Sequence, residues 1–173
     1  MSIGRHVPRR YVVMGVSGAG KSAVGRLFAR ALDVEFVEGD DFHPVENRER
    51  MAAGIPLTDQ DRSGWLQLLA DKLGHAKRDK IGLVLSCSAL KRAYRDILRC
   101  GDNDTQFVFL ASDRALLAQR LANRRGHFMP TSLLESQLAT LEAPAADETV
   151  WVCDISQPLD LLVTMLVERV ASA

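Results

Sequence analysis

The sequence predicts a three-layer α/β/α fold built on a five-stranded, mostly parallel sheet. Short β-rich runs alternate with helical patterns five times along the chain, which is typical of repeated βαβ units. The run Ile81–Ser86 is apolar without alternation, as expected for a strand covered by helices on both faces. The chain has 173 residues, of which 47% are hydrophobic, enough for one packed core. We therefore predict a single domain over residues 1–173.

The first part of the chain supplies two strands and two helices. Tyr11–Met14 is a β-rich run that ends at a glycine, and Ser22–Leu32 carries apolar residues at helical spacing. Glu35–Glu38 is predicted to be a second short strand, also closed by a glycine. The segment His43–Ala53 has a helical pattern that ends at Gly54.

The middle of the chain supplies two further strands and two further helices. Ser63–Ala76 repeats leucines and Trp65 at helical spacing, which predicts a helix. The apolar run Ile81–Ser86 is the third predicted strand, and Leu90–Cys100 is an amphipathic helical pattern. Phe107–Leu110 is predicted to be the fourth strand.

The last part of the chain completes the alternation. Its predicted elements are helices over Asp113–Arg124, Thr131–Leu141 and Pro158–Val170 and a strand over Val150–Cys153. Asp113 or Ser112 can cap the first of these helices, because both side chains can accept a hydrogen bond from a free backbone N–H. Pro158 suits the first turn of the closing helix.

The charges balance overall but are unevenly distributed. The chain carries 22 Lys and Arg residues against 22 Asp and Glu residues, so no global field favours nucleic acid or an anionic membrane. Residues 1–32 and 62–100 are each six charges positive, whereas 33–61 are seven and 131–173 six charges negative. Such blocks are usually solvated faces of successive elements, although cationic loops could also converge on an anionic ligand.

Cysteine content and hydropathy indicate the compartment. Three cysteines without a C-x-x-C pair argue against a disulfide framework or a zinc site and fit a reducing environment. No apolar run is long enough to span a bilayer, and the run that follows Arg9 and Arg10 is too short for a signal peptide. We therefore expect a cytoplasmic protein that binds neither membranes nor nucleic acid.

The strongest motif is a complete G-x-x-x-x-G-K-[ST] sequence between the first strand and the first helix. Its residues are Gly15, Val16, Ser17, Gly18, Ala19, Gly20, Lys21 and Ser22. The glycines let backbone N–H groups turn toward phosphates, and the helix N-terminus adds a partial positive charge beside them. Lys21 is expected to reach the β- and γ-phosphates, and the Ser22 hydroxyl to bind Mg²⁺. The motif therefore predicts a site for ATP and magnesium.

A weaker, competing motif lies within the same stretch. Gly18–Ala23 fits G-x-G-x-x-[GA], and Asp40 follows at about the distance of a ribose-binding acid in a dinucleotide fold. That interpretation leaves Gly15 and the Lys21–Ser22 pair unexplained. It also leaves little chain for the substrate domain of a dehydrogenase, so we favour the nucleoside triphosphate.

The remaining sequence favours a small-molecule kinase over a motor or switch NTPase. The strand Ile81–Leu85 is followed by Ser86-Cys87-Ser88, without the aspartate that usually helps those proteins to hold magnesium. No N-K-x-D motif for guanine occurs either. An Arg-rich stretch late in the chain is typical of a lid that closes over phosphates and excludes water. A nucleotide-binding regulatory module is the alternative from another class.

Asp40 follows the second predicted strand and is the candidate general base. Ligands of open α/β sheets lie beyond the carboxyl ends of the strands, so Asp40 should lie beside the phosphate loop and face an acceptor. A carboxylate there can bind the attacking hydroxyl and accept its proton, and it could touch Mg²⁺ through water. The neighbouring Asp41 is a candidate N-cap for the helix that begins near His43.

Several segments outside the phosphate loop carry further motifs. They are residues 40–51, 54–66, 87–96, 127–130, 136–137 and 141–148. The G-D-x-x-H-P motif that begins at Gly39 and the C-S-A-L-K-R motif that begins at Cys87 are the most specific. Together these segments resemble the gluconate kinase (gluconokinase) family of P-loop small-molecule kinases, from about residue 10 to residue 160.

The resemblance implies an ATP-dependent kinase that converts D-gluconate to 6-phospho-D-gluconate. It also implies a nucleoside-monophosphate-kinase-like P-loop fold with a lid, and often a homodimer. Two departures are small: Arg50 stands where lysine is common, and Gly64 where proline often precedes the tryptophan. A P-loop kinase of another small acceptor, such as shikimate or a nucleoside monophosphate, is the alternative enzyme.

A sugar acid presents hydroxyls and one carboxylate, so its site needs polar groups and a guanidinium or ammonium group. Within an acceptor-binding segment over residues 40–66, the spacing places His43 and Asn47 on one helix face. Trp65 and Leu66 in that segment are expected in the core. The predicted acceptor-binding residues are Asp40, His43, Asn47, Arg48, Arg62, Ser88, Lys91, Arg92 and His127. Which basic residue binds the carboxylate stays open.

The lid is predicted over residues 124–131. Arg120 and Arg124 share one helical face, where guanidinium groups could stabilise charge on the transferring phosphoryl group. A basic last turn that stabilises the helix dipole is the simpler alternative for this pair. We expect the other arginines of the Leu90–Cys100 helix, Arg95 and Arg99, to be solvated, and Cys87 to be a small buried residue.

Overall fold

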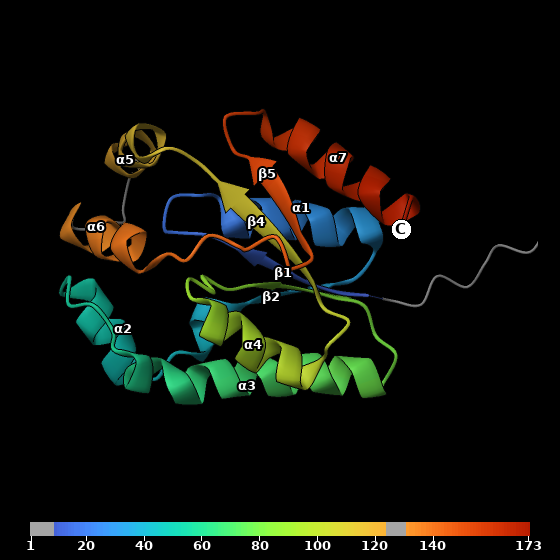
Figure 1. Cartoon of the computed structure of the whole chain (residues 1–173), viewed down its shortest axis with the longest axis horizontal. Coiled ribbons are helices and arrows are strands. Elements are labelled where there is room, and N and C mark those ends of the chain that lie inside the picture. Colours follow the sequence, from blue (N-terminus) through green and yellow to red (C-terminus); the bar gives the residue numbers. More distant parts are fainter. Residues whose placement is uncertain (1–8, 124–130) are drawn as a thin grey trace, which may run out of the picture.

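The computed structural model describes residues 9–123 and 131–173, which form the predicted layered fold (Figure 1). In chain order the elements are β1 (Arg10–Met14), α1 (Lys21–Leu32), β2 (Glu35–Glu38), the 3₁₀ turn η1 (Gly39–Phe42), α2 (Val45–Ala52), α3 (Asp59–Arg78), β3 (Leu83–Ser86), α4 (Arg92–Gly101), β4 (Gln106–Ala111), α5 (Arg114–Ala122), α6 (Thr131–Thr140), β5 (Val150–Asp154) and α7 (Leu159–Ala171). The strands of this part of the chain form one five-stranded sheet in the order β2-β3-β1-β4-β5, and every pair is parallel. The predicted fold class is confirmed.

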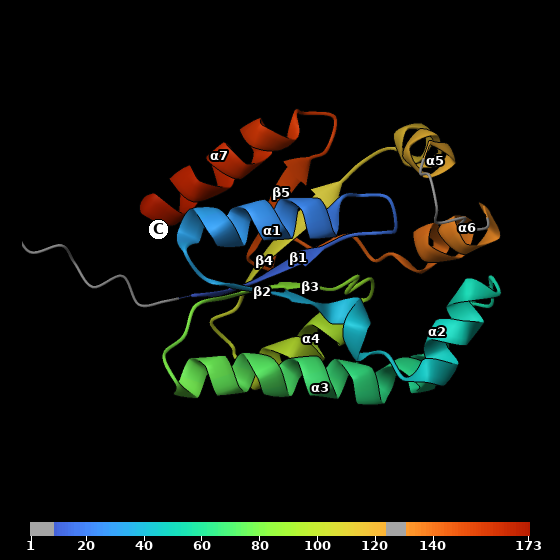
Figure 2. The ribbon, with the colours of Figure 1, turned by 180° about the vertical axis from the view of Figure 1, so that it is seen from behind.

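Helices cover both faces of this sheet. Figures 1 and 2 show α1 and α7 on one face and α3 and α4 on the other, while α2, α5 and α6 lie beyond one end. Strands β2 and β3 lie on one side of β1, and β4 and β5 on the other, so the loop after β1 opens at the point where the strand order reverses. That point is where parallel α/β sheets bind ligands. None of the helices in the described residues is long and apolar enough to cross a bilayer.

The core is centred on the middle strands. All five residues of β1 and all four of β3 are buried, as the apolar run without alternation predicted. Trp65 and Leu66, expected in the core, are each 1% exposed, and Cys87 is buried as well. The strands that carry the phosphate loop and Cys87 therefore form a rigid base for the groups that follow them.

Helix α3 begins four residues earlier than the leucine spacing predicted, at Asp59 and not at Ser63. The Thr58 hydroxyl accepts a hydrogen bond from the backbone N–H of Asp61 at 3.2 Å, and the Asp61 carboxylate accepts one from the Thr58 N–H at 2.8 Å. This reciprocal capping box satisfies two N–H groups that would otherwise lack partners. Its consequence is that Asp59 and Arg62 stand on the first turn of a helix and not in a loop.

Helix α2 begins later than predicted, at Val45. Pro44 occupies its N-cap, and His43 before it has extended backbone angles at the end of η1. The expectation that His43 and Asn47 share one helix face is therefore wrong, because His43 does not belong to the helix. Both side chains are nevertheless buried, at 5% and 6% exposure.

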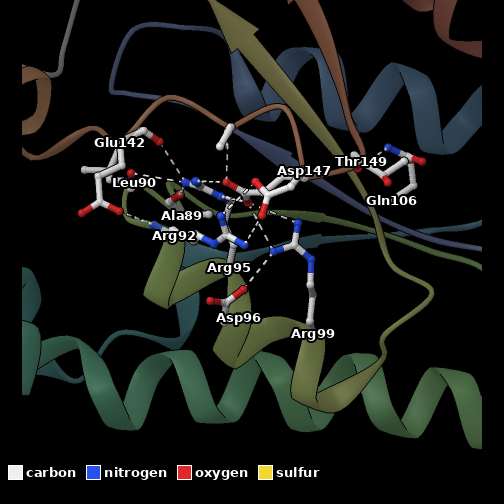
Figure 3. A network of polar contacts seen from close by, with 12 residues as sticks. Ala89, Leu90, Arg92, Arg95, Asp96, Arg99, Gln106, Glu142, Asp147 and Thr149 are labelled. Carbon is white, nitrogen blue, oxygen red and sulfur yellow. Dashed lines mark hydrogen bonds and ion pairs between the residues drawn. The ribbon is translucent and has the colours of Figure 1, made fainter.

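The expectation that Arg95 is solvated is wrong (Figure 3). Its side chain is fully buried against the Glu148 carboxylate, with two N···O distances of 2.7 Å. The guanidinium also donates to the carbonyl oxygens of Ala89 and Glu142, at 3.1 Å each. Segment 141–149 crosses α4 and brings this carboxylate onto the helix, which the helical pattern of α4 alone could not indicate. Arg99 is partly shielded by the same carboxylate, at 3.3 Å.

Candidate active site

The phosphate loop follows β1 and opens α1, as its motif predicts. Gly18 and Gly20 have φ angles of +83° and +93°, which residues with a Cβ rarely adopt. A Cβ on Gly18 would also lie 3.1 Å from Cγ of Leu121. Gly20 is the N-cap of α1 and offers no side chain to the free N–H groups of the first turn. The loop therefore has the geometry of an anion cradle.

Two long-range hydrogen bonds hold this loop. The Gly15 N–H donates to the carbonyl oxygen of Ser88 at 3.3 Å, so Ser88 contacts the loop through its backbone. The Ser17 N–H donates to Oε1 of Gln137 at 2.7 Å. Gln137 lies on α6. In the sequence it was noted only as part of segment 136–137, one of the segments that resemble the gluconate kinase family. Lys21 folds along the loop and donates from Nζ to the Val16 carbonyl at 3.1 Å.

Glu38 is a functional candidate that the sequence reasoning missed. The Ser22 hydroxyl donates to its Oε2 at 2.5 Å, and the Ser86 hydroxyl donates to its other carboxylate oxygen. The N–H of Gly39 donates in turn to Ser86 Oγ at 3.2 Å. In the sequence, the missing aspartate after β3 argued only against a motor or switch NTPase. A strand-end acid comes instead from the neighbouring β2, and its position at the last residue of that strand was the available signal.

The pair Ser22–Glu38 suits a magnesium ion that is shared with nucleotide phosphates. Mg²⁺ prefers oxygen ligands and is usually held by one or two protein groups together with phosphates and waters. In residues 9–123 and 131–173 no cluster of three or more His, Cys, Asp or Glu side chains could hold a metal ion by itself. The hydroxyl and the carboxylate therefore fit a partial set of ligands, completed by the substrate.

Asp40 lies two residues beyond the end of β2, within η1. Its side chain is 64% exposed, and Oδ1 is 4.0 Å from Nε2 of His43. The pKa of Asp40 lies above its ordinary value, chiefly because surrounding protein displaces water from the carboxylate. Lys21 opposes the rise, and the carboxylates of Glu38 and Asp41 add to it. Asp40 is thus an accessible carboxylate within the field of the phosphate-loop lysine.

His43 is buried against Trp65, with ring centroids 3.9 Å apart and a 19° interplanar angle. The indole N–H of Trp65 donates to the Gly39 carbonyl at 2.7 Å, which fixes the ring below η1. Burial, together with the positive charges of Arg62 and Arg48, lowers the pKa of His43 to about 4. Its Nδ1 is buried and has no hydrogen-bond partner among the described residues. A neutral imidazole whose buried Nδ1 has no hydrogen bond among the described residues therefore lies beside Asp40.

Asn47 and Arg48 follow on α2. The Asn47 side-chain amide donates to the carbonyl oxygen of Asp61 at 2.7 Å, which ties α2 to the first turn of α3. Arg48 is exposed and acts electrostatically on His43. Of these two side chains, only that of Arg48 is exposed to solvent. The roles of both residues in binding the acceptor stay predictions.

Arg62 and Lys91 approach one another from two different helices. Arg62 Nη1 donates to the Leu57 carbonyl at 2.8 Å and to the Tyr94 hydroxyl at 3.2 Å. Lys91 Nζ donates to both carboxylate oxygens of Asp59, at 2.9 and 3.0 Å. The Tyr94 hydroxyl also donates to Asp59. The structure thus brings together two of the predicted acceptor-site cations.

The third predicted acceptor-site cation of this region, Arg92, binds segment 141–149 and not the Asp59 carboxylate (Figure 3). Its guanidinium binds the Asp147 carboxylate through two hydrogen bonds of 3.0 and 2.7 Å. Its backbone N–H donates to Oε2 of Glu142 at 2.7 Å. Arg92 therefore joins α4 to segment 141–149, whereas the neighbouring Lys91 joins α4 to α3.

Arg120 lies over the phosphate loop in the last turn of α5. Its Nη2 donates to the Ile155 carbonyl after β5 at 2.6 Å, and a Cβ on Gly20 would be 3.8 Å from its Nη1. The predicted partners Arg124 and His127 lie outside the described residues, as does most of the predicted lid over 124–131. Of the lid arginines, Arg120 is thus the one whose position beside the loop can be described.

The predicted charged groups converge on one point of the sheet. Burial raises the pKa of the Cys87 thiol to about 12; Asp40 adds to this rise, while Lys21 and Arg62 oppose it. Electrostatic effects of this kind fall off with distance, so all three charges lie near the thiol. They come from the first residue of α1, from η1 after β2 and from the start of α3, and Cys87 itself follows β3.

Comparisons with known proteins agree with this arrangement. The model of the shikimate kinase family matches residues 17–151. The thermoresistant gluconokinase of Escherichia coli K12 is 46% identical over 170 residues, which cover 97% of each chain. The chain belongs to the gluconokinase family. A gluconokinase of Gluconobacter oxydans is 52% identical over 143 residues, covering 83% of this chain and 80% of that protein.

The gluconokinase family also accounts for the fold. A crystal structure of a gluconokinase from Sinorhizobium meliloti superposes with a TM-score of 0.87 at 46% identity, covering 97% of this chain and 94% of that one. The chain thus shares its fold with that gluconokinase over nearly its whole length.

Proposed function

We propose that this protein transfers the γ-phosphoryl group of ATP to D-gluconate and releases 6-phospho-D-gluconate and ADP. The observation that carries the proposal is the arrangement beyond the ends of β1 and β2: Arg120 lies over the phosphate loop along which Lys21 folds, and Asp40 stands in η1 directly after β2. It supports a site where a phosphate-binding lysine, a carboxylate and a guanidinium act on one acceptor. The family membership supports gluconate as that acceptor.

ATP would be held by the phosphate loop, whose residues are Gly15, Val16, Ser17, Gly18, Ala19, Gly20, Lys21 and Ser22. Lys21 would bind the β- and γ-phosphates, and Arg120 and Arg124 would stabilise the charge on the transferring group. Magnesium, when bound, would neutralise phosphate charge; Ser22 and Glu38 would hold it. Closure of the lid over residues 124–131 would exclude water.

Asp40 would act as the general base. Its exposed carboxylate can accept a hydrogen bond from the acceptor hydroxyl and take up the proton as the new O–P bond forms. The Lys21 charge counteracts the rise in its pKa, which helps the carboxylate to stay ionised near neutral pH. His43 stays neutral beside it and can exchange hydrogen bonds with a sugar hydroxyl without adding charge.

The acceptor would lie over residues 40–66 and the loop after β3. The residues proposed to bind it are Asp40, His43, Asn47, Arg48, Arg62, Ser88, Lys91, Arg92 and His127. Among these, Arg92 is engaged by Asp147 and Ser88 contacts the phosphate loop by its backbone, so the contacts of Arg62 and Lys91 support direct binding best.

Release of ADP in the presence of ATP and magnesium tests this function. D-gluconate, shikimate and a nucleoside monophosphate are offered as acceptors at equal concentrations. Turnover is expected with gluconate, and the product should carry one phosphate at the terminal hydroxyl by NMR. Faster turnover with shikimate or the nucleotide would assign another acceptor. Slow ADP release that ignores every acceptor would indicate a regulatory NTPase.

A homodimer also stays a prediction for this chain. Large apolar side chains remain exposed on α7; they are Leu159, Leu161 and Met165, with exposures of 37 to 45%. Packing two copies on this face would remove apolar surface from water. Sedimentation equilibrium is expected to give twice the monomer mass, and a single-chain mass at micromolar concentration would contradict it.

A further inference from the structure

Tyr94 and Asp59 form a polar cluster with the cations Arg62 and Lys91. The reaction described above assigns no role to Tyr94 or to Asp59. We propose that Tyr94 and Asp59 are positioning residues that orient Arg62 and Lys91 to bind the carboxylate of the sugar acid. The inference rests on the proposed function, because it assigns the group that recognises the charged end of gluconate. It makes this cluster the place where a sugar acid is distinguished from a neutral polyol.

The Tyr94 hydroxyl links the two helices that carry the cations. It donates to the Asp59 carboxylate on α3 and accepts from Arg62 Nη1 at 3.2 Å. Arg62 Nη1 also donates to the Leu57 carbonyl at 2.8 Å. One nitrogen of the guanidinium is thus fixed at two points, and a planar group fixed in this way has a defined orientation.

The other side of the same guanidinium is available. In the described residues Nη2 and Nε of Arg62 have no hydrogen-bond partner, and Arg62 has no ion pair. A guanidinium presents two parallel N–H groups that match the two oxygens of a carboxylate. Arg62 can therefore keep its structural bonds through Nη1 and bind an acceptor carboxylate through the free edge.

Lys91 is held by the same cluster. Its ammonium group donates to both oxygens of Asp59, and its third N–H is not used by that contact. The Tyr94 ring lies between the cations, with its centroid 5.6 Å from Arg62 Cζ and 5.7 Å from Lys91 Nζ. Asp59 offsets one of the two positive charges, which limits their mutual repulsion while leaving a net positive site for one carboxylate.

The cluster lies close enough to the reacting groups to serve one substrate. Arg62 precedes Trp65 by one turn of α3, the Trp65 ring stacks on His43 with centroids 3.9 Å apart, and His43 Nε2 is 4.0 Å from Asp40 Oδ1. The carboxylate and the terminal hydroxyl of gluconate are at opposite ends of a six-carbon chain. A carboxylate bound at Arg62 would leave the other end of the chain free to reach Asp40.

The test removes the Tyr94 hydroxyl and keeps the ring. In Tyr94→Phe the KM for gluconate is expected to rise about tenfold, because Arg62 and Asp59 both lose a charge-assisted hydrogen bond. The KM for ATP should stay within about twofold, since the hydroxyl that is removed bonds to Arg62 and Asp59 and the residues of the phosphate loop are unchanged. Tyr11→Phe is the matched control: Tyr11 is the chain's other tyrosine, packed against Phe28 and Trp151 at the far end of β1.

A double-mutant cycle shows whether Tyr94 acts through Arg62. Arg62→Lys keeps the charge but lacks the planar fork, so it should raise the gluconate KM by itself. If Tyr94 orients Arg62, adding Tyr94→Phe to Arg62→Lys should raise the gluconate KM much less than it does in the parent. Thermal melting of each variant shows whether a change in KM accompanies loss of the fold.

The outcomes separate the inference from the function on which it rests. If the parent protein phosphorylates gluconate but Tyr94→Phe leaves its gluconate KM unchanged, the positioning role is wrong. An equal rise in the KM for ATP, or the same effect from Tyr11→Phe, would also overturn it, because a purely structural loss would act that way. A parent protein without gluconate turnover would overturn the proposed function itself.

Discussion

Asp40 occupies a position where two opposing influences act on one carboxylate. Surrounding protein and the neighbouring acids raise its pKa, while Lys21 lowers it. An accessible carboxylate of this kind can exchange a proton with an acceptor hydroxyl more readily than one held tightly by an ion pair. The sequence could predict this residue because it follows a strand at the end of the sheet where ligands bind.

Asp40→Asn tests the base directly. The amide keeps the shape of the side chain but cannot take up a proton, so kcat should fall by roughly 10²- to 10⁴-fold. Binding of a fluorescent ATP analogue should persist, because the phosphate loop is unchanged. The adjacent Asp41→Asn serves as control and is expected to keep its kcat. A kcat for Asp40→Asn near that of the parent would assign the proton to another group.

His43 predicts a pH dependence of stability. Its pKa is about 4 in the folded protein against about 6.5 in the unfolded chain, so the unfolded state binds the proton more readily. Its contribution is therefore fully present above pH 6.5, declines as the pH falls below that value and levels off below about pH 4. Between pH 7 and pH 5 the loss should be about 2 kcal/mol in the free energy of unfolding.

Urea unfolding at pH 7 and pH 5 measures that loss. His43→Gln removes the titrating group, so the difference between the two pH values should shrink. His75→Gln is the matched control, because His75 is exposed on α3. If His43→Gln kept the full pH dependence, another group would be responsible.

At the level of elements, sequence patterns located the strands better than the helix starts. The strands begin and end within two residues of their predicted limits, because each is an apolar run next to a glycine or a polar turn. Helix α5 begins after Asp113 as predicted, with the carboxylate accepting from the Leu116 N–H at 2.8 Å. Helix α3 begins before its apolar residues, since its capping box lies a full turn ahead of Trp65.

Two glycines on neighbouring helices predict opposite effects of the same substitution. A Cβ on Gly101, the last residue of α4, would lie 1.9 Å from the Ala70 carbonyl oxygen, because α3 and α4 approach closely there. A Cβ on Gly64 in α3 would meet nothing within 4 Å. Gly64→Ala should stabilise the protein by about 0.5–1 kcal/mol through helix propensity alone.

Gly101→Ala should instead destabilise by roughly 2 kcal/mol or more, because backbone must move to admit the methyl group. Chemical denaturation of both variants gives the two free energies. The two changes in the free energy of unfolding need not be equal in size. Stabilisation by Gly101→Ala would contradict the close approach of the two helices.

At the scale of the whole molecule, the balanced charge conceals pairings between distant segments. Lys21 belongs to the basic block 1–32, Asp40 to the acidic block 33–61 and Arg62 to the basic block 62–100. The alternation of charge along the sequence therefore partly reflects residues that serve one site. Residues whose role depends on a distant partner could not be predicted from local pattern. Glu38 meets Ser22 across two elements, and Gln137 meets the phosphate loop over a separation of 120 residues.

The ion pair between Arg95 and Glu148 joins three parts of the chain: α4, the loop after β3 and segment 141–149. Arg95 binds the loop after β3 through the Ala89 carbonyl and segment 141–149 through Glu148 and the Glu142 carbonyl. The loop after β3 in turn holds the phosphate loop through Ser88. The buried pair thus fixes the distance between the acceptor side of the site and the segment that follows α6.

Glu148→Gln tests this arrangement because it keeps the shape of the side chain and removes its charge. A buried arginine without its counter-charge should reduce the free energy of unfolding by about 3 kcal/mol or more. Glu148 has a pKa of about 2 in the folded protein, below its usual value of 4.5, because Arg95 stabilises the anion. Its stabilising contribution is therefore full above pH 4.5 and is lost as the pH falls toward 2, so the variant should lose stability at neutral pH and show a weaker acid dependence.

Asp147→Asn is the matched control on the same segment. Asp147 pairs with Arg92 on the same helix, but the two side chains are 63% and 47% exposed, and water can replace the lost contact. Its unfolding midpoint in urea should stay close to that of the parent at every pH. If both variants lost stability equally, burial would not be what distinguishes the two pairs. If neither did, segment 141–149 would be held on α4 by its apolar and backbone contacts, and the Arg95–Glu148 pair would not be what couples it to the loop after β3.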